Sequence, residues 1–225
     1  MAFGDLVQTT AKLSCNGGTS MAQAFPGATT VGNLLVVEVW AFGNIDWAPG
    51  DVTDSENNQY ALATGTTGKP AIWYATATTT GTPTVTVDPL NQGSWFAQGS
   101  AQEYSASGAI LDRAVTNNGS STTPSTGTSA ATTVNDALII AVMDISSNQA
   151  SITVDAVSPA FTERAETLSN AIMAGECDSR VVSAGGTQAC SWTCATTGTW
   201  RACLAAFRNG STGGTVPTRG FTFIG

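Results

Sequence analysis

Two matching stretches of sequence decide the fold class: TVGNLLVVEVW at Thr30–Trp40 and TVNDALIIAVM at Thr133–Met143. Each stretch begins with a short polar turn and continues as an almost unbroken run of apolar residues. A strand with one solvated face alternates apolar and polar residues, so these continuous runs predict strands that are buried on both faces. The second stretch follows the first by 103 positions, which indicates an internal duplication.

Two further pairs of segments occur in the same order and favour a diverged repeat. KPAIW at Lys69–Trp73 resembles SNAIM at Ser169–Met173, and GSW at Gly93–Trp95 resembles GTW at Gly198–Trp200. Small insertions in loops explain why the spacing differs from pair to pair. We therefore expect two repeats, at about residues 1–108 and 109–208.

The composition favours an all-β chain. The 225 residues include 24 Gly and only 11% charged residues, and Thr, Ser and Asn supply much of the polarity. Thr favours strands, Gly and Asn favour turns, and no stretch has a sustained helical period. Strands are predicted at Leu6–Ser14, Met21–Phe25, Asn33–Phe42, Tyr60–Thr64, Ala71–Thr76, Thr84–Val87, Trp95–Ser105, Leu138–Asp144, Phe161–Arg164, Ala171–Cys177, Val181–Ser183, Thr187–Thr193 and Thr199–Phe207.

The length of the chain suits one large β-domain, so we expect a single β-sandwich of two large sheets over residues 1–208, built from both repeats. The alternative is two tandem sandwiches of immunoglobulin-like size, with Gly119–Gly127 as the linker between them. In the single-domain arrangement the same segment is a surface loop.

The charge distribution argues against two classes of partner. The net charge is −8, the isoelectric point is about 4.2, and Lys12 and Lys69 are the only lysines. The six arginines are scattered along the chain, so no basic stripe is available to neutralise phosphates. The negative charge would also be repelled by an anionic membrane. We expect neither nucleic-acid nor membrane binding.

The start of the sequence, MAFGDLVQTT, has neither the basic residues nor the apolar run of a signal peptide. Synthesis in a host cytoplasm without a signal peptide is therefore expected. Abundant Thr, Ser and Gly with little Lys is nevertheless typical of an extracellular surface. A virion surface protein meets both conditions, because virions assemble inside the cell and are released by lysis.

Histidine is absent from the sequence, which removes the commonest general base and the commonest zinc ligand. A hydrolase would then depend on paired carboxylates, and Glu38 and Glu103 on predicted strands are the candidates. The more ordinary interpretation is that both are edge or solvent-facing acids. We predict a protein without enzymatic activity or cofactor.

Cysteines and acidic residues provide weaker candidate sites. A disulfide among Cys177, Cys190, Cys194 and Cys203 is possible in an oxidising medium, while their spacing is not that of a zinc knuckle. Calcium could be bound where oxygen donors gather in one loop region, but these residue types also form ordinary turns. The candidate calcium ligands are Asp46, Asp51, Asp54 and Glu56.

One aromatic residue is a candidate ligand platform. Trp47 precedes the turn Pro49-Gly50 and could stack on a sugar, although a single loop Trp more often packs on the core. Trp40, Trp73, Trp95 and Trp200 lie on predicted strands and are expected to fill the core.

The end of the chain has a composition of its own. Residues 209–225 consist of a Gly-rich linker followed by the β-forming apolar segment Phe221, Thr222, Phe223 and Ile224. This segment either docks on its own domain as an edge strand or adds a strand to a neighbouring subunit as an intermolecular anchor.

Several segments resemble a widespread family of bacterial and phage proteins with a jelly-roll-like β-sandwich. The resemblance covers nearly the whole chain and is carried by Gly32–Val37, Val52–Tyr60, Ile72–Ala75, Thr84–Val87, Glu103–Ser105, Leu138–Ile140 and Ala205–Arg208. It implies a two-sheet jelly-roll-like sandwich, no catalytic residues, and a place among capsid decoration or tail-associated proteins.

The sequence therefore predicts a structural phage virion protein, a capsid decoration or other particle-surface protein. Its partners would be other virion subunits of the capsid or tail lattice, and a homo-oligomer is expected. The alternative is a carbohydrate- or receptor-binding module of a tail or cell-surface assembly.

Overall fold

The computed structural model describes residues 1–42, 45–65, 70–89, 95–155, 159–170 and 173–210. These residues form strands and no helix, which confirms the predicted all-β fold, and none of them belongs to a helix that could cross a membrane. The strands are β1 (Leu6–Thr9), β2 (Leu13–Gly18), β3 (Met21–Ala24), β4 (Leu34–Phe42), β5 (Val52–Asp54), β6 (Ala61–Thr64), β7 (Ala71–Thr76), β8 (Thr84–Val87), β9 (Trp95–Tyr104), β10 (Ile110–Ser121), β11 (Ala137–Ile145), β12 (Ile152–Val154), β13 (Thr162–Asn170), β14 (Met173–Val182), β15 (Trp192–Cys194) and β16 (Gly198–Arg208).

Each half of the chain contributes one large sheet and one small sheet. In the first half the large sheet has the order β1-β9-β4-β7-β6, with β2 also paired to β9, and the small sheet has the order β3-β8-β5. In the second half the large sheet has the order β10-β16-β11-β14-β13, and the small sheet contains β12 and β15. A bridge between Ser125 and Ser191 stands where β3 pairs with β8 in the first half. The two halves thus repeat one strand order, as a duplication predicts.

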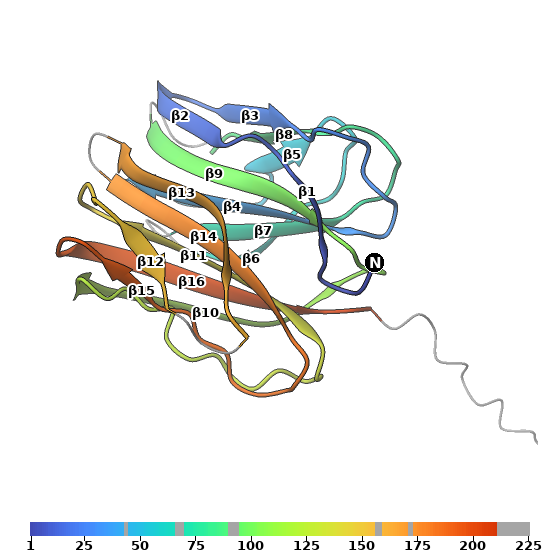
Figure 1. The fold of residues 1–225 in the computed structure, drawn as a ribbon. Coiled ribbons are helices and arrows are strands. Elements are labelled where there is room, and N and C mark those ends of the chain that lie inside the picture. The colour runs from blue at the N-terminus through green and yellow to red at the C-terminus, as the bar shows by residue number, and fades with distance from the viewer. Residues whose placement is uncertain (43–44, 66–69, 90–94, 156–158, 171–172, 211–225) are drawn as a thin grey trace, which may run out of the picture.

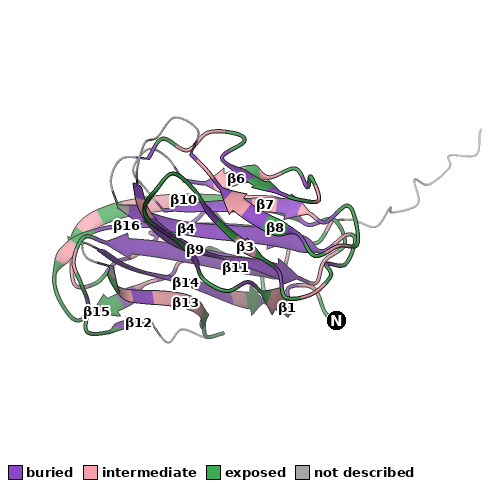
Figure 2. Ribbon diagram, turned by 90° about the horizontal axis from the view of Figure 1, so that it is seen from above, coloured by how far each residue is buried: buried purple, intermediate pink, exposed green. Residues whose placement is uncertain are grey.

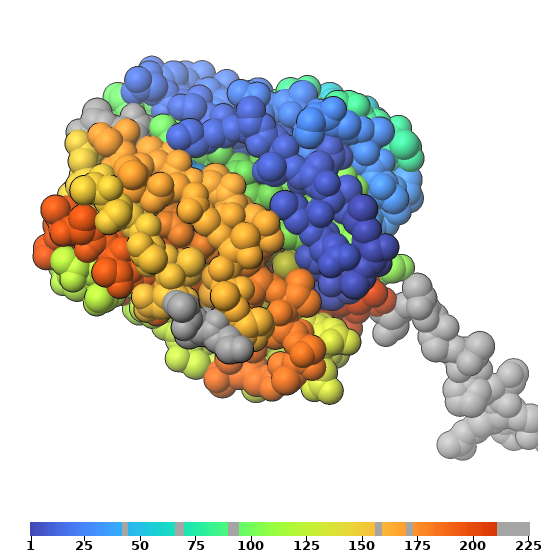
Figure 3. Space-filling view, viewed as in Figure 1, coloured from blue at the N-terminus to red at the C-terminus, as the bar shows by residue number. Residues whose placement is uncertain are grey.

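The four sheets are stacked as layers, with the two large sheets in the middle (Figure 1). An outer core lies between the large and small sheets of each half. A central core lies between the two large sheets and combines residues from both halves. In Figure 3 the blue and green atoms of the first half meet the orange and red atoms of the second along a broad boundary. The expectation of two large sheets did not include the two small sheets, although β3 and β8 were predicted as strands, because a strand pattern does not show which strands pair.

The middle strands β4 and β11 are buried on both faces, as their continuous apolar runs predict (Figure 2). In β4, Leu35 and Val37 face the outer core of the first half, while Leu34 and Val36 face the central core. Successive side chains of a strand point to opposite faces, so each of these strands supplies two cores at once.

The structure corrects the spacing of the repeat. Leu35 faces an outer core, but the residue 103 positions later is Leu138, which faces the central core. Side chains alternate between the two faces of a strand, so a shift of one residue exchanges the face toward which every side chain points. The alignment of Thr30–Trp40 with Thr133–Met143 matches residues that face different cores, and it is therefore wrong by one residue. Trp95 and Trp200, 105 positions apart, both face the outer cores. A continuous apolar run has no alternation that could fix its register.

Some predicted strands also differ from the observed ones. The sequence missed β5, β12 and the long strand β10, and it divided β14 by a separate strand at Val181–Ser183. The segment Gly119–Gly127 is not a linker throughout, because its first three residues belong to β10. Polar strands such as β10 lack the apolar alternation on which the prediction depended.

The packing between the two halves can be tested at Gly175 in β14. A Cβ atom there would overlap Trp40 of β4, with Trp40 Cγ only 2.6 Å away. We expect Gly175→Ala to lower the free energy of unfolding by about 1–3 kcal/mol, through overpacking of a rigid core. Chemical denaturation of the variant and the parent measures this difference in the free energy of unfolding.

Gly27→Ala is the matched control, since its Cβ would lie 3.4 Å from the nearest atom, Gln8 Oε1. It should change stability little. A Gly175→Ala variant as stable as the parent would contradict the close contact between the halves.

Candidate functional site

The two carboxylates proposed as a catalytic pair lie on opposite faces of one sheet. Glu38 points into the central core from β4, whereas Glu103 of β9 is directed away from it. Glu103 accepts hydrogen bonds from the Thr30 amide (2.8 Å) and the Asn33 side chain (2.6 Å), which holds the turn before β4. Both acids are fully buried, so their interpretation as edge or solvent-facing residues is wrong. They cannot flank one substrate.

Glu38 is an uncharged acid in the central core. Burial raises its pKa to about 8, although the Gln102 amide and the Arg164 guanidinium favour the charged form. Gln102 also donates to Cys177 Sγ across the boundary between the halves, at 3.9 Å. Glu38 has no solvent-exposed surface.

A second pair of buried acids lies under the small sheet of the second half. Glu176 and Asp178 are on the same face of β14, and the Trp192 indole donates to Asp178 Oδ2 at 2.7 Å. Burial, followed by the proximity of Asp178, raises the pKa of Glu176 to about 10, and burial raises the pKa of Asp178 to about 6. The pair therefore holds a proton at neutral pH. Sequence analysis missed it, because β14 carries no motif.

The candidate calcium ligands do not form a cation site. Asp54 accepts from the amides of Glu56 and Asn58, from the Asn58 side chain, and from the Tyr60 hydroxyl. Asp51 accepts from the Ala48 amide at 2.7 Å, and Asp46 is exposed. Among the residues that the structure describes, no three metal-ligating side chains gather. The acids form turns, as their residue type favours.

Trp47 is a half-buried residue on the rim of the first outer core. Its ring meets Trp95 edge-on, with the ring centroids 6.1 Å apart. The contact makes Trp47 part of the packing and does not favour a ligand platform. Trp40, Trp73, Trp95 and Trp200 are buried as predicted.

All five cysteines are buried free thiols, so the disulfide that the sequence allowed is not present. Cys177 and Cys203 face the central core, with Val142 between them in the register of the large sheet. Cys190 and Cys194 face an outer core, beyond that sheet. Disulfides need Cα atoms within about 7 Å, and two strand spacings exceed this distance.

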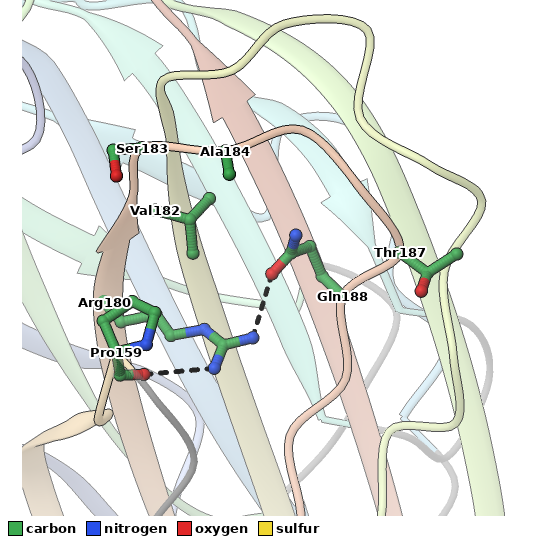
Figure 4. A pocket seen from close by; sticks show the side chains of 7 residues that line it. All are labelled: Pro159, Arg180, Val182, Ser183, Ala184, Thr187 and Gln188. Atoms are coloured by element: carbon green, nitrogen blue, oxygen red, sulfur yellow. Dashed lines mark hydrogen bonds between the residues drawn. The ribbon is translucent and has the colours of Figure 1, made fainter.

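The structure describes a pocket of about 230 Å³ beside the end of β14 (Figure 4). Its lining residues are Pro159, Arg180, Val182, Ser183, Ala184, Thr187 and Gln188. The Arg180 guanidinium donates to Gln188 Oε1 at 2.9 Å and to the Pro159 carbonyl at 3.2 Å, and it lies 4.3 Å from the centre of the Phe161 ring. Burial lowers the pKa of Arg180. Six of its seven lining residues lie between Arg180 and Gln188, but this stretch has no sequence motif that would have marked a pocket.

The second notable feature is the edge strand β10. It pairs with β16 on one side, and the strand order of the described residues ends with it on the other. Figure 2 shows its residues as intermediate or exposed along one border of the molecule. Charges and a bulge occur only near its start, at Asp112 and Arg113, and Ala114–Ser121 contains neither charge nor proline.

The other edges of the large sheets are better protected. The edge strand β13 carries Glu163, Arg164 and Glu166 and has two irregularities in register. The edge strands β1 and β6 have only four residues each. Short, charged or bulged edges resist pairing with other chains, so β10 is the edge best suited to accept a strand.

The candidate anchor Phe221, Thr222, Phe223 and Ile224 lies outside the described residues. Comparisons with protein-family models, with curated proteins and with solved structures found no match to this chain.

The thiol assignment leads to a simple prediction. Burial raises the pKa of Cys190 above its usual range and that of Cys194 to about 11, which suppresses the reactive thiolate. We expect little reaction of the folded protein with a thiol reagent at pH 8, and five reactive thiols after denaturation without reductant. Fewer than five would reveal a disulfide.

The acid in the central core predicts a pH dependence of stability. Between pH 4.5 and 8, folded Glu38 keeps a proton that the unfolded chain releases, so this group destabilises the fold as pH rises through that range. Glu38→Gln removes the effect. We expect the variant to gain roughly 2 kcal/mol or more relative to the parent on going from pH 4.5 to pH 8.

Denaturant unfolding of both proteins at the two pH values measures the change. The difference in unfolding free energy between variant and parent at pH 4.5 is the internal control, because it reports the cost of burying an amide in place of a protonated carboxyl group. A difference between variant and parent that is the same at both pH values would show that Glu38 does not hold the proton.

Proposed function

We propose that this protein is a structural, non-enzymatic component of a bacteriophage particle, a capsid decoration or other particle-surface protein. It would bind neighbouring virion subunits, including further copies of itself, by strand addition. The proposal rests mainly on the edge strand β10, which is twelve residues long and has neither charges nor a bulge along most of its length. An added strand would gain backbone hydrogen bonds along this edge.

The end of the described chain supports strand exchange as the means of assembly. Asn209 Oδ1 accepts from the Ser107 amide at 2.8 Å, so the chain leaves the fold close to the start of β10. The fifteen residues from 211 to 225 could span up to about 50 Å when extended. Phe221–Ile224 could therefore reach the β10 edge of an adjacent subunit.

The strand order gives fold-level support. Each half interleaves its strands between a large and a small sheet, in the manner of a jelly roll with one strand moved to the large sheet. Jelly rolls occur in viral capsid proteins and in lectins, and this is an argument by analogy. The separation of Glu38 from Glu103 on opposite sheet faces also favours a role without catalysis.

Two sets of variants test the proposal by light scattering. The first set is Ala114→Lys with Ser120→Lys, which places charges at two exposed positions of β10, and deletion of residues after Asn209. We expect the parent to form an oligomer, and either change to shift the mass to that of a monomer, because charges on an edge oppose strand pairing.

The matched control is Thr162→Lys with Ser169→Lys, two exposed positions on the charged edge β13. It adds the same charge and should leave the oligomer intact. A parent that is monomeric at every concentration, with no binding to phage particles, would contradict the proposal.

A further inference from the structure

The pocket beside β14 contains a positive charge without a carboxylate partner. The ion pairs of the described residues are Arg113 with Asp112 and Arg201 with Asp144, and Arg180 takes part in neither. In a chain of net charge −8, a half-buried guanidinium without a counter-charge is unusual. Arg180 is hydrogen-bonded only to neutral groups, so its charge is not compensated and an anion would supply the counter-charge.

The Arg180 side chain is held in place before any ligand arrives. Gln188 Oε1, the Pro159 carbonyl and, at 3.5 Å, the Ala189 carbonyl accept its terminal N–H groups, and the ring of Phe161 packs against the guanidinium. Its Nε–H is buried and has no acceptor among the described residues. A fixed guanidinium also loses little entropy when it binds.

The rest of the pocket has the character of a sugar site. Ser183 and Thr187 supply hydroxyl groups at the exposed rim, whereas the buried Gln188 amide is occupied by Arg180 and the Gly186 carbonyl. Val182 and Ala184 provide apolar wall (Figure 4). A volume of about 230 Å³ lies below the roughly 300–1,000 Å³ typical of drug-sized ligands, which restricts the occupant to about one ring.

From these features we infer that the pocket binds the carboxylate of an acidic sugar unit, such as a uronic acid within a surface polysaccharide. Arg180 would bind the carboxylate, and the hydroxyl groups of Ser183 and Thr187 would bind the ring substituents. A phosphate is less well matched, since the lining offers one guanidinium and no lysine or second arginine. The inference is independent of strand addition at β10, because it concerns a pocket within one chain.

Isothermal titration of the full chain with sodium D-glucuronate tests the inference, with D-glucose and inorganic phosphate as comparison ligands at constant ionic strength. We expect saturable binding of glucuronate at concentrations up to about 10 mM. Glucose and phosphate should each bind at least tenfold more weakly.

Three variants connect binding to the pocket. Arg180→Gln should weaken glucuronate binding at least tenfold, and Arg180→Lys should restore only part of it, because an ammonium lacks the planar fork. If removal of Arg180 disturbs the fold, Ala184→Glu provides a second variant, since this exposed change places a negative charge at the rim. Ala61→Glu, at an exposed position on β6 in the other half, is its charge-matched control and should bind like the parent.

Binding that is lost in Arg180→Gln and Ala184→Glu but kept in Ala61→Glu would support an acidic-sugar site. No glucuronate binding at about 10 mM, or phosphate binding as strong as glucuronate binding, would overturn it. Equal loss in Ala61→Glu would also overturn it, because the effect would then come from net charge.

Discussion

The contact between the two large sheets is the constraint on which the rest of the structure depends. Each large sheet has one face against its partner and the other against a small sheet, so its middle strands have no solvated side. Such strands must be apolar throughout, and this is why the runs in β4 and β11 show no alternation. The duplication supplies both sheets, and their mutual burial makes one body of the two halves.

Several acidic groups are buried inside this body, and their burial shifts their protonation. Glu38, Glu176 and Asp144 are buried, and burial raises the pKa of each of them, to about 8, 10 and 7 respectively. The Arg201 guanidinium pairs with Asp144 at 3.0 Å and also donates to the Ala41 carbonyl of the other half. The Arg201 contacts join the two large sheets across the central core, which Glu38 also faces, whereas Glu176 lies on the outer face of β14.

The features that favour interaction lie at the periphery. The β10 edge offers backbone groups along a strand, and the pocket beside β14 offers one charge with a few hydrogen-bonding groups. Both belong to the second half, and the corresponding positions in the first half differ: β1 and β2 are short where β10 is long. Divergence after duplication would thus have left one half to complete the fold and the other to carry recognition.

The sequence by itself determined the all-β class, most of the strands with apolar runs, and the burial of the strand tryptophans. It could do so because apolar pattern and turn residues act locally. It did not determine the register of the repeat, the pairing of strands into small sheets, or β10, since continuous apolar runs and polar strands carry no alternation and a strand pattern does not specify its partners. Only the tertiary structure placed Glu38 and Glu103 on opposite faces, because this depends on the pairing of strands that are distant in the sequence. It also folded residues 180–188 around Arg180 with Pro159 beside them, an arrangement that no local pattern predicts.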